Sequence, residues 1–192
     1  MLSIRGSASP SSYTYSARIS VPKGLTVANG GRLERVEEQE HAVVYHYGSV
    51  LPSNRMDFAI AQYLQSTIAP FSAFYFPEHK DAIGQILQAA RSAVGLLSRW
   101  FGPLESGRTM TLIEVPDGWG SQSDITTIVQ SAGAFADPAR RFELYHEISH
   151  LWDPPSTDQP SPRWNEGLVG KLLPTAPRLN NKMPQKTEAD PQ

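Results

Sequence analysis

The order of apolar and polar residues divides the chain into a β-rich first part and a mixed second part. Near the start, apolar residues alternate with more polar ones, as a half-buried strand requires: Tyr13, Tyr15, Ala17, Ile19 and Val21. Asn29-Gly30-Gly31 predicts a hairpin turn between strands at 25–27 and 32–36. Further strands are predicted at 41–47 and 56–60, and residues 65–70 are expected to cross into the second part.

The second part mixes strand-like and helical patterns. Residues 72–76, 110–115 and 125–129 predict strands, and the last two are joined by a Gly/Ser-rich loop that contains Trp119. Between the first two strands, apolar residues recur at helical spacing and predict an amphipathic helix over 78–101.

Another helix is predicted from Asp137, a favourable N-cap, with Pro138 in its first turn. It carries the sequence His146-Glu147-Ile148-Ser149-His150. Residues i and i+4 of a helix differ by about 400° of rotation and about 6 Å of rise, so both histidines project from one face. They can ligate a tetrahedral zinc, and Glu147, offset by about 100°, can take a proton from a zinc-activated water.

Two histidines leave a zinc ion short of one protein ligand. Pro154 and Pro155 end the helix, and residues 153–161 read as a loop rich in Pro, Ser, Thr and Asp. A second helix is then expected to carry Glu166, within Trp164-Asn165-Glu166-Gly167-Leu168. Glu166 is therefore the best candidate for the third zinc ligand, and Trp152 and Trp164 are expected to pack between the two helices.

The other polar residues have simpler interpretations. His41 and His46 are expected to be exposed or packed strand residues, and His79, at a helix start, is expected to be solvated. Glu143 and Asp153 lie close enough in sequence to orient a ligand histidine. They are more simply surface charges.

Residues 146–152 and 164–168 resemble the zinc signature of the membrane alanyl and puromycin-sensitive aminopeptidases, which are gluzincin metallopeptidases. Phe101-Gly102-Pro103-Leu104 and the segment 111–116 resemble the helix-to-strand passage that precedes the active site in that family. The resemblance implies zinc ligands His146, His150 and Glu166, with Glu147 as general base. It also implies hydrolysis of peptide bonds by an aminopeptidase-like enzyme holding one Zn²⁺ per chain.

The resemblance places Gly120, Ser121 and Gln122 beside the substrate, where a strand can pair with a peptide by β-augmentation. On sequence alone, the same residues form an ordinary turn, and both interpretations stay open. In that family a glutamate pairs with the free α-amino group of the substrate. The corresponding stretch here, residues 118–124, has no glutamate, and Asp124 is the candidate to substitute for it. Residues 167–192 contain neither tyrosine nor histidine, whereas the family has a catalytic tyrosine downstream. A truncated, non-catalytic zinc- or peptide-binding remnant is therefore the alternative, and a missing C-terminal domain or partner chain is expected.

Composition limits the partners. The chain has 192 residues, of which 40% are hydrophobic, so it can bury a substantial core. A net charge of −2 with scattered basic residues gives no argument for nucleic acid. No apolar run of about eighteen residues predicts a membrane span, and no signal peptide is recognised. The absence of cysteine excludes disulfides and thiolate ligands. A soluble protein acting on a peptide is expected, and its compartment stays unknown.

These observations predict an α+β fold with three regions. Residues 1–68 form a β-rich lobe that resembles the end of an N-terminal antiparallel β domain. For residues 69–173 the resemblance implies the N-terminal part of a thermolysin-like zinc peptidase domain, built from β-strands and the HExxH helix. Residues 174–192 are rich in Pro, Asn, Lys and Gln and are expected to be disordered.

Overall fold

The computed structural model describes residues 12–53, 55–104 and 108–152. The chain begins with five strands in two small antiparallel sheets. One sheet has the order β1 (Ser16–Pro22), β4 (Ala42–Gly48), β3 (Arg32–Glu38), and the other pairs β2 (Thr26–Asn29) with β5 (Phe58–Ala61). The alternation predicted at the start of the chain is present in β1, where exposed and less exposed positions alternate up to buried Val21.

The hairpin predicted around Asn29-Gly30-Gly31 is wrong, because β2 and β3 belong to different sheets. The buried Asn29 side chain bends the chain here: its Oδ1 accepts hydrogen bonds from the Tyr15 hydroxyl at 2.8 Å and the Gly31 N–H at 2.7 Å. Its Nδ2 donates to the Asp57 carbonyl at 2.6 Å. The contacts with Tyr15 and Asp57 come from distant segments, which a local turn signal does not report.

A five-stranded mixed sheet forms the second layer, with the order β6 (Leu64–Ile68), β7 (Phe71–Tyr75), β8 (Met110–Val115), β10 (Thr127–Ser131), β9 (Gln122–Ser123). β7, β8 and β10 are parallel, whereas the edge strands β6 and β9 are antiparallel to their neighbours. The crossing predicted at 65–70 is wrong, since most of it is β6. Its side chains are largely exposed, so the apolar pattern there is weak.

Helices cover one face of this sheet. α1 (Ile83–Phe101) links β7 to β8 and follows the 3₁₀ turn η1 (Pro77–His79). After β10 come α2 (Ala132–Ala136), η2 (Pro138–Arg140), α3 (Arg141–Ser149) and η3 (His150–Trp152). The helices and this sheet face enclose one core, which includes Ile86, Leu112, Ile128, Phe135, Leu144 and Ile148.

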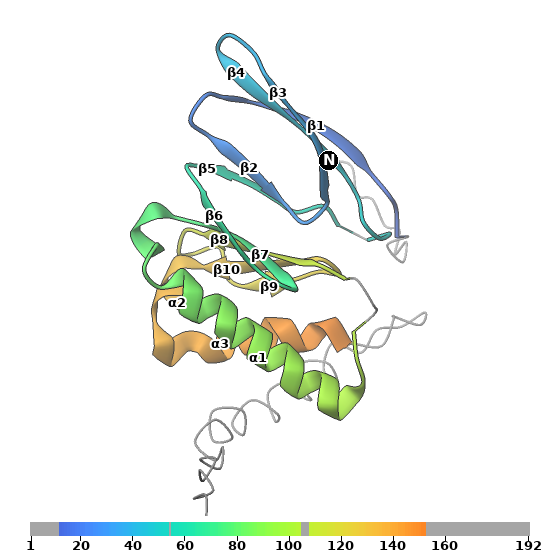
Figure 1. The fold of residues 1–192 in the computed structure, drawn as a ribbon, viewed down its shortest axis with the longest axis vertical. Coiled ribbons are helices and arrows are strands. Elements are labelled where there is room, and N and C mark those ends of the chain that lie inside the picture. The colour runs from blue at the N-terminus through green and yellow to red at the C-terminus, as the bar shows by residue number, and fades with distance from the viewer. Residues whose placement is uncertain (1–11, 54, 105–107, 153–192) are drawn as a thin grey trace, which may run out of the picture.

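The opposite face packs on β2 and β5 of the N-terminal lobe through a second core, which includes Ala28, Tyr63, Phe74, Ile113 and Val129. Figure 1 shows the resulting layers: helices, the five-stranded sheet, then the N-terminal strands. The α+β class predicted from the sequence is confirmed. In the described part of the chain, no helix is both long and apolar enough to cross a membrane.

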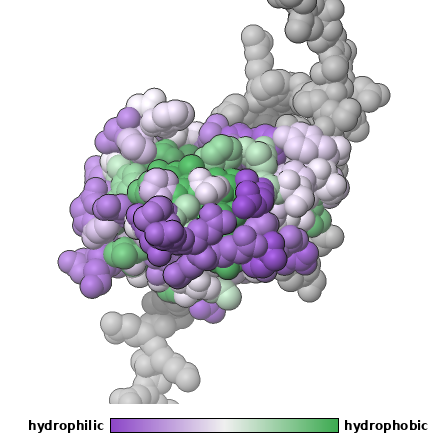
Figure 2. Space-filling view, turned by 90° about the horizontal axis from the view of Figure 1, so that it is seen from above, coloured by the Kyte–Doolittle hydropathy of each residue, from purple (hydrophilic) through white to green (hydrophobic). Residues whose placement is uncertain are grey.

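Several large apolar side chains of the N-terminal lobe remain exposed, among them Leu33 and Val36 on β3 and Phe58 and Ile60 on β5. Seen from above, this end of the molecule shows apolar side chains gathered between hydrophilic ones (Figure 2).

Candidate functional site

The helix that carries the HExxH sequence begins close to where the sequence predicts. Asp137 caps the 3₁₀ turn η2, because its Oδ1 accepts a hydrogen bond from the Ala139 N–H at 2.8 Å. Pro138 occupies the first position of that turn, and α3 proper starts at Arg141. Local capping and the fixed φ of proline thus set the start of the helical path.

Core packing fixes the orientation of α3. Leu144, Ile148 and Leu151 are buried in the core beneath the sheet. Trp152 anchors the end of the helical path, since its indole Nε1 donates to the Gly102 carbonyl at 2.8 Å, just beyond the end of α1. With this face buried, helical geometry turns His146 and His150 away from the core.

The two histidine side chains converge. Their Nε2 atoms lie 3.1 Å apart, and the ring centroids are 4.8 Å apart with the rings nearly perpendicular. Two nitrogens bound tetrahedrally at about 2.0–2.1 Å from zinc lie about 3.3 Å apart. The observed separation therefore fits two ligands of one metal ion, with the same ring nitrogen of each histidine directed to it.

Glu147 lies between the two histidines in the sequence. The residue is buried, with 6% of its surface exposed. Ser149 is also buried, and its hydroxyl donates to the His146 carbonyl at 2.6 Å. Glu143, considered as a support for a histidine, instead accepts hydrogen bonds from the Arg140 guanidinium at 2.8 and 3.2 Å. Within residues 12–53, 55–104 and 108–152, no group of three or more metal-ligating side chains is assembled.

The third predicted ligand, Glu166, lies outside the described residues, as do Asp153 and Trp164. The structure therefore describes two of the three predicted ligands and the predicted general base.

The predicted substrate-binding residues lie at the edge of the five-stranded sheet. Gly120, with φ of +74°, lies two residues before β9, and the Ser121 hydroxyl accepts a hydrogen bond from Gln130 Nε2 at 2.9 Å. Gln122 pairs with Val129 on β10. α3 packs against both β9 and β10. The fold thus brings the edge strand and the HExxH helix together.

Asp124 lies just beyond this edge strand, and its position is set by the N-terminal lobe. Its Oδ2 accepts a hydrogen bond from the Ser53 hydroxyl at 2.6 Å.

Gln130 supports the edge strand and was not anticipated from the sequence. It is 1% exposed, and its Oε1 is buried without a hydrogen-bond partner in the described part of the chain. An orphaned buried acceptor of this kind typically costs about 1–3 kcal/mol. The available signal was its position directly after the apolar pair Ile128-Val129 in a predicted strand.

The interpretation of His79 as a solvated residue is wrong. Its Nδ1 contacts the carboxylate of Glu114, a fully buried residue on β8, which also accepts a hydrogen bond from the Phe76 N–H at 2.8 Å. Burial raises the pKa of the Glu114 carboxyl, and the contacts with Phe76 and His79 oppose that rise. His41 is exposed and His46 is packed beside Arg35 and Glu37, as expected of strand histidines.

Comparison of the sequence with protein-family models gives no match, and comparison with curated proteins gives no significant one.

Proposed function

We propose that this chain is a gluzincin-like zinc metallopeptidase that hydrolyses peptide bonds. The observation that carries the proposal is the pair of Nε2 atoms, 3.1 Å apart, of His146 on α3 and His150 at the start of η3. Ligands of a common metal require this convergence, and two imidazoles can also reach it by hydrogen-bonding to each other; the zinc measurement below distinguishes the two.

His146 and His150 would hold the zinc with Glu166, the third ligand predicted from the sequence. When bound, the zinc supplies a Lewis acid that polarises the scissile carbonyl and makes a water molecule more acidic. Glu147 accepts the proton of the attacking water and returns it to the leaving amine. Its burial favours this role, because few waters compete for its carboxylate.

Gly120, Ser121 and Gln122 would bind the peptide backbone. β9 is the last strand of its sheet, and an extended substrate can pair with such an edge through main-chain hydrogen bonds. Gly120 leaves the backbone accessible, and because α3 contacts β9, a substrate bound to this strand would lie beside the helix proposed to be catalytic.

The first experiment is zinc stoichiometry on purified, dialysed protein. We expect one zinc per chain in the wild type and in His41→Ala, which removes an exposed histidine. His150→Ala should lose the metal, because two protein ligands hold zinc far less tightly than three. Zinc absent from the wild type, or retained fully by His150→Ala, contradicts the proposal.

The second experiment separates catalysis from metal binding. Glu147→Gln should keep its zinc and lose peptidase turnover by about 10²–10⁴-fold, the usual contribution of a general base. Peptidase assays on amino-terminally unblocked and blocked peptides then distinguish aminopeptidase from endopeptidase action. A wild type that binds zinc without turnover would favour the alternative, a non-catalytic zinc- or peptide-binding module.

A further inference from the structure

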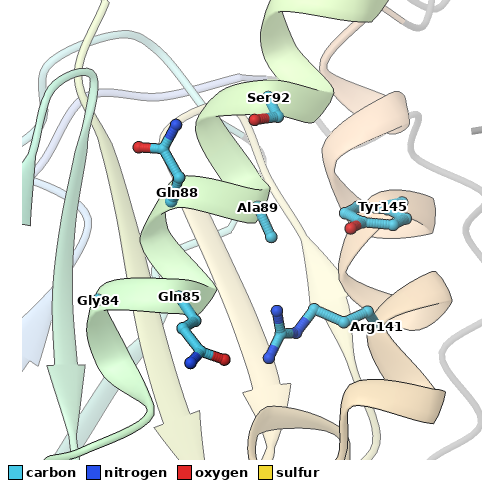
Figure 3. A pocket seen from close by; sticks show the side chains of 7 residues that line it. All are labelled: Gly84, Gln85, Gln88, Ala89, Ser92, Arg141 and Tyr145. Atoms are coloured by element: carbon cyan, nitrogen blue, oxygen red, sulfur yellow. The ribbon is translucent and has the colours of Figure 1, made fainter. Parts of the chain in front are cut away.

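A hollow of about 410 Å³ lies between α1 and α3. Its lining comes from Gly84, Gln85, Gln88, Ala89 and Ser92 of α1 and from Arg141 and Tyr145 of α3. This volume is within the range of small-molecule sites, about 300–1,000 Å³. Figure 3 shows the Arg141 guanidinium reaching from α3 towards α1, with the Gln85 amide opposite.

The lining has the chemistry of an anion site. Arg141 is its one charged residue, and the others supply neutral hydrogen-bonding groups or small side chains. Arg141 Nε is buried and has no hydrogen-bond partner among the described residues, and no ion pair there joins this guanidinium to a carboxylate. A buried guanidinium nitrogen without a partner is costly, and an oxyanion is the partner it fits best.

The start of α1 also affects how strongly the hollow attracts an anion. Gly84 and Gln85 lie in its first turn, which has neither a side-chain cap nor an acidic residue. Asp81, just before the Ala82 N-cap, offsets part of the positive end of the helix dipole, so the dipole adds only weakly to the attraction of Arg141 for an anion. Space is open beside Gly84, because a Cβ built there would meet no other atom within 4 Å.

We propose that this hollow binds a small molecule through a carboxylate or phosphate group, with Arg141 as the recognising residue. Gln85, Gln88, Ser92 and Tyr145 supply the remaining hydrogen bonds. The site is separate from the histidine pair, because His146 follows Tyr145 by about 100° around α3 and so projects from another face. It does not depend on zinc or on peptidase activity.

Calorimetric titration of the full chain with inorganic phosphate, and separately with succinate, tests the proposal at constant ionic strength. We expect a Kd of about 1 mM or tighter for at least one of them. At ten times the Kd, the unfolding temperature should rise by about 3–6 °C. Binding of phosphate alone identifies a phosphate ligand, and binding of succinate alone identifies a carboxylate.

Arg141→Gln should weaken binding by at least about tenfold, since a charge-assisted hydrogen bond is lost. Arg99→Gln is the matched control, because it removes the same charge from the exposed last turn of α1 and should leave the Kd unchanged. Ala89→Leu provides a second variant that keeps Arg141 and fills the hollow, and it should also abolish binding. No binding of either anion, or equal binding by all variants, overturns the proposal.

Discussion

Tyr63 shows how burial of one residue makes stability depend on pH. Its hydroxyl donates to the Glu114 carbonyl at 2.6 Å, and burial, followed by the nearby Glu114 charge, raises its pKa to about 12. Since the unfolded pKa is about 10, the folded state holds this proton more tightly. The stabilisation is complete below pH 10 and is lost as the pH rises towards 12.

Tyr63→Phe should therefore be less stable than the wild type by about 1 kcal/mol at pH 7, the value of one lost hydrogen bond. Between pH 10 and 12 the difference should disappear or reverse, because only the wild type loses the contribution of Tyr63. Urea unfolding followed by tryptophan fluorescence measures this, with Tyr13→Phe, at an exposed tyrosine, as the control. A difference that stays constant from pH 7 to 12 contradicts the assignment.

At the scale of elements, Glu114 joins β8 to the segment that leads into α1. Its carboxylate accepts from the Phe76 N–H and contacts His79, which lie just before and within η1. Glu114→Ala leaves both groups without their partner in a buried place and should cost about 3–5 kcal/mol. Urea unfolding measures the change in the free energy of unfolding. Glu40→Ala is the control and should show almost no change, because the Glu40 carboxylate is exposed. A loss below about 1 kcal/mol for Glu114→Ala would mean that this contact contributes little to the junction.

Local patterns predicted some elements better than others. The span predicted at 110–115 is the strand β8, and the helical spacing over 78–101 gives α1 with a 3₁₀ turn before it. Both segments are rich in buried apolar residues, on both faces of β8 and on one side of α1. β6 was missed because an exposed edge strand has little apolar periodicity, and only its pairing with β7 defines it.

At the scale of the whole molecule, close packing at Gly30 joins the N-terminal lobe to the five-stranded sheet. A Cβ at Gly30 would lie 1.7 Å from Thr127 Oγ1 and 2.9 Å from its Cβ, on β10. Gly30→Ala should therefore separate the two layers locally and destabilise the protein by about 1–3 kcal/mol.

Gly95→Ala is the matched control for this prediction, because a Cβ there meets nothing within 4 Å and lies within α1. It should stabilise the protein by about 0.5–1 kcal/mol through the higher helix propensity of alanine. Thermal unfolding of both variants measures the contrast, and equal stability of the two would argue against tight packing between the layers.

The sequence by itself determined the features that depend only on residues one or two helical turns apart. The Asp137 cap, the burial of Ile148, and the projection of His146 and His150 from one face all follow from helical spacing. These features are local because a helix repeats the same geometry every few residues.

Only the tertiary structure decided what depends on distant segments. It brought His79 to Glu114, the edge strand β9 to α3, and Asn29 to Tyr15, across separations that no periodic pattern encodes. The hollow beside Arg141 arises in the same way, from two helices that are separate in sequence and share one sheet face. Such contacts form when buried surfaces are matched in three dimensions, so their partners cannot be assigned from sequence spacing alone.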